Sequence, residues 1–259
     1  MSHSLFLHYG PGGSSYIENH ELSKFLPATI FWNQPKVKTL SEPFKKLTIA
    51  CTEQVLSIKA PLQLIGHSFG CDLIASILPQ GSEINNAILI SPLQSIPLAF
   101  HSLGEVLNKK EAKPELESAL ALALSKISDI DPATFWGMVG PIVTHPLYQS
   151  IFWQSKVAKE NYDAVAAKSP AFDAEEWQTV IQDYIFNNST DRFSRLNGKK
   201  VLAIFGDSDP YFKAERDLPF WQNLLGKNQV IVLKECGHFP HLEKKSEFIE
   251  IVQSWSRLT

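Results

Sequence analysis

The chain has 259 residues, of which 44% are hydrophobic and 20% charged, a mixture typical of folded globular proteins and not of disordered ones. A formal net charge of −3 offers no general attraction for nucleic acid or anionic lipid, and no apolar run is long enough to cross a bilayer, so we expect neither nucleic-acid binding nor membrane insertion. The 3 cysteines match no CxxC-type metal pattern and the first residues lack the basic segment of a signal peptide, so we expect a cytoplasmic protein without a metal or other cofactor.

Short apolar runs alternate with amphipathic stretches over the first ninety residues or so. The pattern predicts strands at 4–10, 28–33, 61–68 and 85–92, with helices at 14–25, 42–58 and 69–79 between them. Strands that alternate with helices are joined by right-handed crossovers, which makes neighbouring strands parallel. This part of the chain therefore predicts an α/β domain with a mostly parallel sheet flanked by helices.

Strand patterns are absent between residues 95 and 190, where helical stretches rich in aromatic residues follow one another. One interpretation is that these aromatic side chains form a helix-packing core. The other is that some of them line an apolar pocket that faces the sheet. Strands are predicted again at 199–210 and 229–238, with helices at 214–225 and 243–258. The sequence thus predicts one α/β core, residues 1–94 and 191–259, interrupted by a helical insertion at 95–190.

Ser68 lies between two glycines in "GHSFG", directly after a predicted strand and before a predicted helix. G-x-S-x-G at such a junction is typical of a nucleophile elbow, in which a sharp turn exposes the serine hydroxyl. The motif alone is weak, because a glycine-rich turn would also accommodate it. The flanking strand "LQLI" and helix "CDLIASIL" provide the context that the elbow requires.

A serine hydroxyl needs a base, and the base needs a third group that orients it. His238 follows the last predicted strand, and His241 is a competing candidate three residues further on. Asp207 and Asp209 both follow the preceding predicted strand and are candidates for the acid. All of these positions are at the carboxyl ends of predicted parallel strands, where ligands bind in open α/β sheets.

Acyl transfer also needs N–H donors for the oxyanion. The backbone N–H of Phe69, the residue after the serine, is the first candidate. The glycine-rich loop 8–13, "HYGPGG", follows the first predicted strand and is expected to supply the second donor. His8 is expected to support this loop and not to act as a base.

With these motifs in place, the chain resembles the α/β-hydrolase fold proteins over nearly its whole length, and in particular the proline iminopeptidase-like branch. "LHYGPGGSS" is similar to the H-G-G-P-G loop of that branch, with Tyr9 in place of a glycine, and the resemblance assigns the second oxyanion donor to Gly10. "GHSFG" resembles the nucleophile elbow, "FGDSDP" the turn that selects Asp209, and "CGHFPHLE" the segment that selects His238. The insertion corresponds to the helical cap.

Two departures from the family bear on substrate more than on chemistry. The family usually has a β-hairpin before the first core strand, but here that strand is predicted to begin almost at Met1, so we expect a shorter sheet. "WNQPKVKTL" lacks the acidic, glycine-rich turn that is common after the second strand. The resemblance implies a Ser68–His238–Asp209 triad with Phe69 and Gly10 as oxyanion donors. Candidate pocket residues are Tyr9, Trp136, Phe152 and Trp153.

The function favoured by the sequence is hydrolysis of a small carboxylic ester, or of an amide, by a serine hydrolase whose partner is a small-molecule substrate. An iminopeptidase is the alternative, and it would need a carboxylate from the insertion to bind the substrate ammonium group. Candidates for that role are Glu160, Asp163, Asp173, Glu175 and Glu176. A C–C bond hydrolase or lyase, and a ligand receptor with little activity, also remain open, as does the choice between monomer and homodimer.

Overall fold

The computed structural model describes residues 3–58, 62–78, 84–187 and 192–257. A six-stranded sheet with the order β2-β1-β3-β4-β5-β6 forms its centre, and every neighbouring pair is parallel. The strands are β1 (His3–Leu7), β2 (Thr29–Trp32), β3 (Leu62–His67), β4 (Ile84–Ile90), β5 (Val201–Gly206) and β6 (Val230–Leu233). The mostly parallel sheet predicted from the alternation of strands and helices is confirmed.

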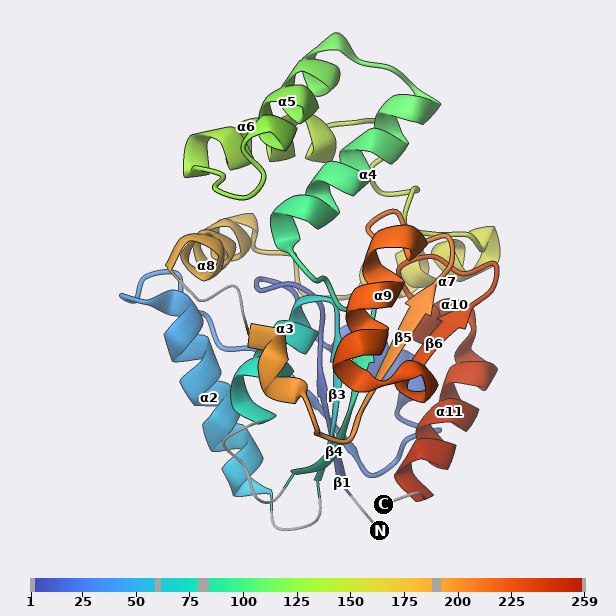
Figure 1. The fold of residues 1–259 in the computed structure, drawn as a ribbon. Helices are drawn as coiled ribbons and strands as arrows, with labels where there is room; N and C mark the ends of the chain where they lie inside the picture. Colours follow the sequence, from blue (N-terminus) through green and yellow to red (C-terminus); the bar gives the residue numbers. More distant parts are fainter. Residues whose placement is uncertain (1–2, 59–61, 79–83, 188–191, 258–259) are drawn as a thin grey trace.

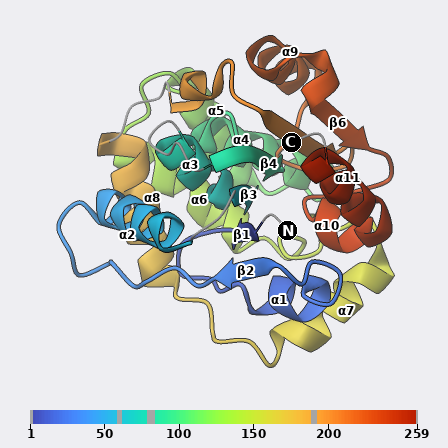
Figure 2. The same ribbon diagram turned by 90° about the horizontal axis from the view of Figure 1, so that it is seen from below.

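Helices cover both faces of the sheet (Figures 1 and 2). The helices of the core are α1 (Tyr16–Leu22), α2 (Pro43–Ser57), α3 (Phe69–Ile77), α9 (Ala214–Leu225), α10 (Pro240–Glu243) and α11 (Lys245–Arg257), with short 3-10 helices at Arg192–Leu196 and Lys227–Gln229. Successive residues of β1 show how the two faces are filled. Leu5 and Leu7 pack into the core beneath α2, α3 and α9, whereas Phe6 packs with side chains of α1 and α11. This alternation follows from the two-residue repeat of a strand, and burial on both faces makes the strands almost uniformly apolar.

The strands end earlier than the sequence predicts, β5 for instance at Gly206 instead of residue 210, and β1 and β6 show the reason. β1 ends at Leu7 instead of residue 10, and β6 ends at Leu233 instead of residue 238. In both cases the residues that follow leave the extended conformation, because Gly10 and Glu235 have φ values of 48° and 50°. The loops gained in this way carry His238 and the expected oxyanion donor Gly10.

Five helices occupy the described residues between β4 and β5, and no strand lies among those residues. They are α4 (Ile96–Lys110), α5 (Pro114–Ser125), α6 (Pro132–Val143), α7 (Lys156–Ala166) and α8 (Ala174–Asn187). Figure 1 shows α4, α5 and α6 above the carboxyl ends of the strands. The boundary predicted near residue 190 falls at 188–191, outside the described residues. None of the helices that the structure describes is both long and apolar enough to span a membrane.

Candidate active site

Ser68 occupies a strained turn between β3 and α3. Its backbone has φ 52° and ψ −116°, in the region that favours glycine, and the turn is held by a 2.8 Å hydrogen bond from its N–H to the carbonyl of Ile90. The side chain is half-buried, in contrast to its fully buried neighbours His67 and Phe69. A strained, partly exposed serine at a strand-to-helix junction is the geometry of a nucleophile elbow.

The two glycines of "GHSFG" are required by close contacts of the backbone. A Cβ atom on Gly70 would lie 2.2 Å from the carbonyl oxygen of Leu7 at the end of β1. A Cβ atom on Gly66 would lie 2.7 Å from the carbonyl carbon of Gly70. The start of α3 is therefore pressed against both the strand before it and β1, and this contact turns Ser68 outward.

Asp209 and His238 form a buried pair at the ends of β5 and β6. Their Oδ2 and Nδ1 atoms are 2.7 Å apart, and because an ionised carboxylate only accepts hydrogen bonds, Nδ1 is the donor. The other oxygen of Asp209 accepts a 2.9 Å hydrogen bond from the N–H of Tyr211. Asp207, by contrast, is exposed and accepts hydrogen bonds from its neighbour Ser208 and from the N–H of Cys236. The structure thus brings Asp209, and not Asp207, to the imidazole.

His67 links the elbow to the His238 loop. Its Nε2 atom lies 2.9 Å from the carbonyl oxygen of His238, and the two imidazole centroids are 5.0 Å apart. Ser68, the next residue, is thereby placed beside this loop, although its hydroxyl makes no hydrogen bond to any residue that the structure describes. Catalytic hydrogen bonds often shorten only when substrate binds.

The 8–13 loop lies against the first turn of α3. A Cβ on Gly70 would also come within 3.1 Å of the carbonyl oxygen of His8, which places the start of this loop beside Phe69. The N–H of Phe69 is in the first helical turn, where no intrahelical acceptor exists. The His8 ring is buried, with Nδ1 2.7 Å from the carbonyl oxygen of Tyr9, and its burial lowers its pKa. It therefore supports the loop, as the sequence suggests.

Three of the four predicted pocket residues surround the His238 loop. Phe152 has its ring centroid 5.8 Å from that of His238, and Trp153 stacks on Phe239 at 4.3 Å. Tyr9 packs edge-on against Phe239, and its hydroxyl lies 2.9 Å from that of Tyr162.

Trp136 is separate from this group. It packs on Trp177 of α8 at 5.5 Å, and its indole N–H donates to Gln182.

Sequence reasoning missed Tyr211, whose ring centroid lies 5.0 Å from that of His238. Its position two residues after Asp209, in the turn "DSDPY", is the signal that could have identified it.

Glu243 was also missed by the sequence analysis. One of its oxygens accepts a hydrogen bond from Gly237 N–H, and the other accepts 2.8 Å bonds from the N–H groups of Gln154 and Ser155. These hydrogen bonds tie the insertion to the His238 loop, and burial raises the pKa of Glu243.

The five acidic residues considered for an ammonium site are all engaged elsewhere. Both oxygens of Glu176 accept backbone N–H groups, those of Val37 and Lys38, at 2.7 and 3.1 Å. Asp173 and Glu175 pair with Lys38. The remaining two acids form pairs within helix α7, Glu160 with Lys156 and Asp163 with Lys159. None of the contacts described for these carboxylates reaches Ser68 or His238.

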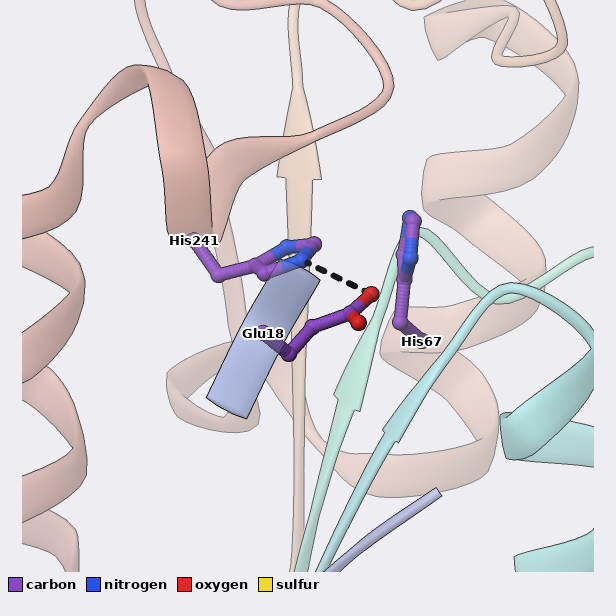
Figure 3. A group of neighbouring side chains, drawn as sticks. All are labelled: Glu18, His67 and His241. Atoms are coloured by element: carbon purple, nitrogen blue, oxygen red, sulfur yellow. Dashed lines mark ion pairs between the residues drawn. The ribbon is translucent and has the colours of Figure 1, made fainter. Parts of the chain in front are cut away.

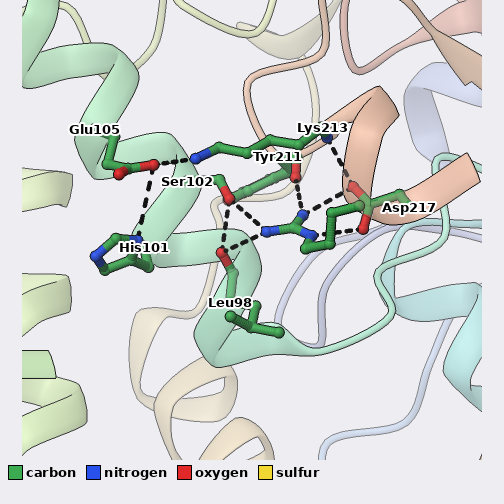
Figure 4. A network of polar contacts seen from close by, with 8 residues as sticks. Leu98, His101, Ser102, Glu105, Tyr211, Lys213 and Asp217 are labelled. Atoms are coloured by element: carbon green, nitrogen blue, oxygen red, sulfur yellow. Dashed lines mark hydrogen bonds and ion pairs between the residues drawn. The ribbon is translucent and has the colours of Figure 1, made fainter. Parts of the chain in front are cut away.

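A polar network fastens helix α4 to the segment that follows Asp209 (Figure 4). The Arg216 guanidinium donates to Asp217 and to the Ser102 hydroxyl at 2.8 Å, and also to the carbonyl oxygen of Tyr211 at 3.0 Å. Lys213 pairs with Glu105 of α4. The first helix of the insertion is thus held by the same segment that positions the carboxylate.

The close contact at the elbow predicts a large effect for Gly70→Ala. The added methyl group would overlap the Leu7 carbonyl, so we expect the free energy of unfolding to fall by about 2 kcal/mol or more in urea denaturation. The matched control is Gly137→Ala in α6, where a Cβ meets nothing within 4 Å. That change should raise stability by about 0.5–1 kcal/mol, because alanine replaces glycine inside a helix. Equal stability of Gly70→Ala and the wild type would contradict the packing described here.

Known proteins resemble this chain in fold, but none of those that match is similar enough in sequence to indicate a closer relationship. No protein-family model matches the chain, and no curated protein matches its sequence. Among solved structures, a proline iminopeptidase-related protein from Thermus thermophilus matches with a TM-score of 0.68 and 18% identity, over 98% of this chain and 89% of that one. MenH from S. aureus matches with a TM-score of 0.65 and 18% identity, over 99% and 93% of the two chains. An esterase from Exiguobacterium antarcticum matches with a TM-score of 0.61 and 12% identity, over 99% and 92%. The parallel sheet, the elbow at Ser68 and these likenesses together show that the chain has the α/β-hydrolase fold.

Proposed function

We propose that this protein is a serine hydrolase that cleaves a small carboxylic ester through an acyl-enzyme on Ser68. The observation that carries the proposal is the buried 2.7 Å contact between Asp209 and His238, in a loop that His67 joins to the strained turn of Ser68. A buried carboxylate that accepts the Nδ1 proton leaves the Nε2 atom of the imidazole as the base. That tautomer is the one required to take a proton from a serine.

In the proposed reaction, His238 takes the Ser68 proton as the serine oxygen attacks the ester carbonyl. Asp209 holds the imidazole in place and stabilises its cationic form. The N–H groups of Phe69 and Gly10 would receive the negative charge that develops on the carbonyl oxygen. The alcohol then leaves with the proton from His238, and water activated by the same residue hydrolyses the acyl-enzyme.

The surroundings of His238 favour an ester over a peptide with a free amino terminus. Its described neighbours are aromatic rings, those of Phe152, Tyr211 and Phe239 among them. A substrate ammonium group in such surroundings would lose its hydration, and this cost has to be offset by a carboxylate. The five acids of the insertion that could serve are bound to lysines or to backbone N–H groups. A neutral acyl group needs no such partner.

Ser68 itself is tested most directly by covalent labelling. We expect a fluorophosphonate probe to label the wild type once per chain, and Ser68→Ala to abolish labelling and to reduce ester hydrolysis by about 10³-fold or more. Ser246→Ala, at an exposed position of α11, is the matched control and should behave like the wild type. A folded wild type that is neither labelled nor active on p-nitrophenyl esters would favour a ligand receptor instead.

The two aspartates of the β5 turn provide a second test, because they differ in their contacts and not in chemistry. Asp209→Asn should lower kcat for p-nitrophenyl butyrate by about 10⁴-fold, since an amide no longer enforces the tautomer that the reaction needs. Asp207→Asn should leave kcat within about twofold, because this exposed side chain does not contact His238. Similar losses in the two variants would contradict the assignment of the acid.

Substrate class is tested by comparing an uncharged ester with an amide that carries a free amino group. We expect kcat/KM for p-nitrophenyl butyrate to exceed that for proline p-nitroanilide by at least about 10²-fold, since none of the five candidate acids is free to bind the ammonium group of proline. Acetylation of the proline nitrogen removes this charge and should reduce the difference in kcat/KM between the ester and the proline amide. Faster turnover of the free proline amide would establish the iminopeptidase alternative.

A further inference from the structure

Glu18, His67 and His241 converge behind the candidate active site from three separate elements. They belong to α1, to the end of β3 and to α10, and none is more than 1% exposed. Their ligand atoms all lie within 4.8 Å of one another, and Figure 3 shows the Glu18 carboxylate pointing between the two imidazole rings. His241 Nε2 and Glu18 Oε1 are 3.8 Å apart, which is too long for a hydrogen bond.

These side chains leave several buried polar atoms without a hydrogen-bond partner. They are Oε2 of Glu18, Nδ1 of His67 and both ring nitrogens of His241. Groups buried in this way are normally paired, because water has been removed from them without replacement. One atom from each of the three side chains can bind a single common partner, whereas the second ring nitrogen of His241 points away from it.

Local hydrogen bonding directs Glu18 into this cluster. The sequence Ser15-x-x-Glu18 is a capping-box pattern, in which the glutamate would accept the N–H of the serine. Here both the N–H and the hydroxyl of Ser15 donate to Oδ1 of Asn33 at 3.0 Å instead. The carboxylate is therefore free of the capping role and lies in the interior.

His67 is already held as metal-bound histidines are held. Its Nε2 donates to the carbonyl of His238 at 2.9 Å, so its Nδ1 carries a lone pair. Histidine ligands of metals commonly donate their second ring N–H to a backbone carbonyl, which fixes the tautomer and the orientation of the ring. The free Nδ1 of His67 is one of the unpaired atoms of the cluster.

The charge of the cluster favours a cation over a bridging water. The contacts described for the Glu18 carboxylate include no lysine or arginine, and the groups that face it are the imidazoles of His67 and His241. The nearby Lys245 pairs with Glu21 on the outer side of α1. A water would satisfy hydrogen bonds but would leave the carboxylate without a positive partner, and buried charges are usually paired or bound to a metal.

We propose that Glu18, His67 and His241 form a binding site for one divalent transition-metal ion, with zinc as the best match. Two imidazole nitrogens and one carboxylate oxygen are a known zinc ligand set, with a fourth position left for water. Four-coordinate zinc holds such ligands about 3.3 Å apart, so the three side chains must move closer together than they are here. The flexible Glu18 side chain, with three rotatable bonds, is the one best able to do so.

A metal at this position would stabilise the fold and would have no direct role in the reaction of the substrate. It would join α1, the elbow and α10 through one centre, and it would fix His67, whose N–H holds the His238 carbonyl. The site does not depend on the proposed hydrolase activity, and its test does not measure activity.

The test is zinc binding by the full chain. Protein treated with chelator and then dialysed is incubated overnight with Zn²⁺ and passed through a desalting column, and bound zinc is measured by mass spectrometry. We expect one zinc per chain and a rise in melting temperature with added zinc. Glu18→Gln should weaken binding by at least about tenfold, since even loss of a supporting residue around a metal costs 10–100-fold. His20→Asn, an exposed position on the same helix, is the control and should bind like the wild type.

Zinc retention that is equal in Glu18→Gln and the wild type would overturn the proposal, as would a wild type that retains none. If Glu18→Gln does not fold, the wild type decides the matter through its histidine side-chain NMR signals. Zinc should shift the ring nitrogens of the two histidines of this cluster, His67 and His241. A site that holds only water predicts no such shift, and zinc that shifts only the exposed histidines would also refute the assignment.

Discussion

The contact between the start of α3 and the end of β1 is the constraint on which the candidate site depends. Gly70 allows α3 to approach the Leu7 carbonyl so closely that no other residue fits, and Ser68 is forced into a left-handed turn. The same contact brings the loop after β1 to the first turn of α3, where the Phe69 N–H lacks a helical partner. One packing contact therefore holds the turn of Ser68 and brings the start of the 8–13 loop to the first turn of α3.

The His238 loop is held from several sides, and the insertion supplies part of that support. The N–H of His238 donates to the carbonyl of Phe152, and Glu243 binds the N–H groups of Gln154 and Ser155. On the other side, the Arg216 network joins α4 to the carbonyl of Tyr211, two residues after Asp209. The helical insertion is thus part of the framework that positions His238 and Asp209. A movement of the insertion would therefore displace these two residues as well.

Much of this arrangement could be predicted from sequence because it is local. A serine between glycines at a strand-to-helix junction defines an elbow, and the alternation of strands and helices implies that loops after different strands meet at one edge. The choice of Asp209 over Asp207 needed the family resemblance, since both are acids in the same turn. The role of Glu243, the contact of Tyr211 and the cluster around Glu18 could not be predicted, because each depends on which distant segments the fold packs together.

The same distinction explains why chemistry is easier to infer here than substrate. The groups proposed to act on a carbonyl come from the core sheet, whose parallel order fixes where its loops meet. The groups that would distinguish an ester from a charged amine come from the insertion, where carboxylates serve several purposes. Lys38 binds both Asp173 and Glu175, and Glu176 caps the backbone of residues 37 and 38. An acidic residue in the sequence of the insertion therefore says little about the substrate. The carboxylates that hold the insertion to the core are of the same kind as one that would bind a substrate ammonium group.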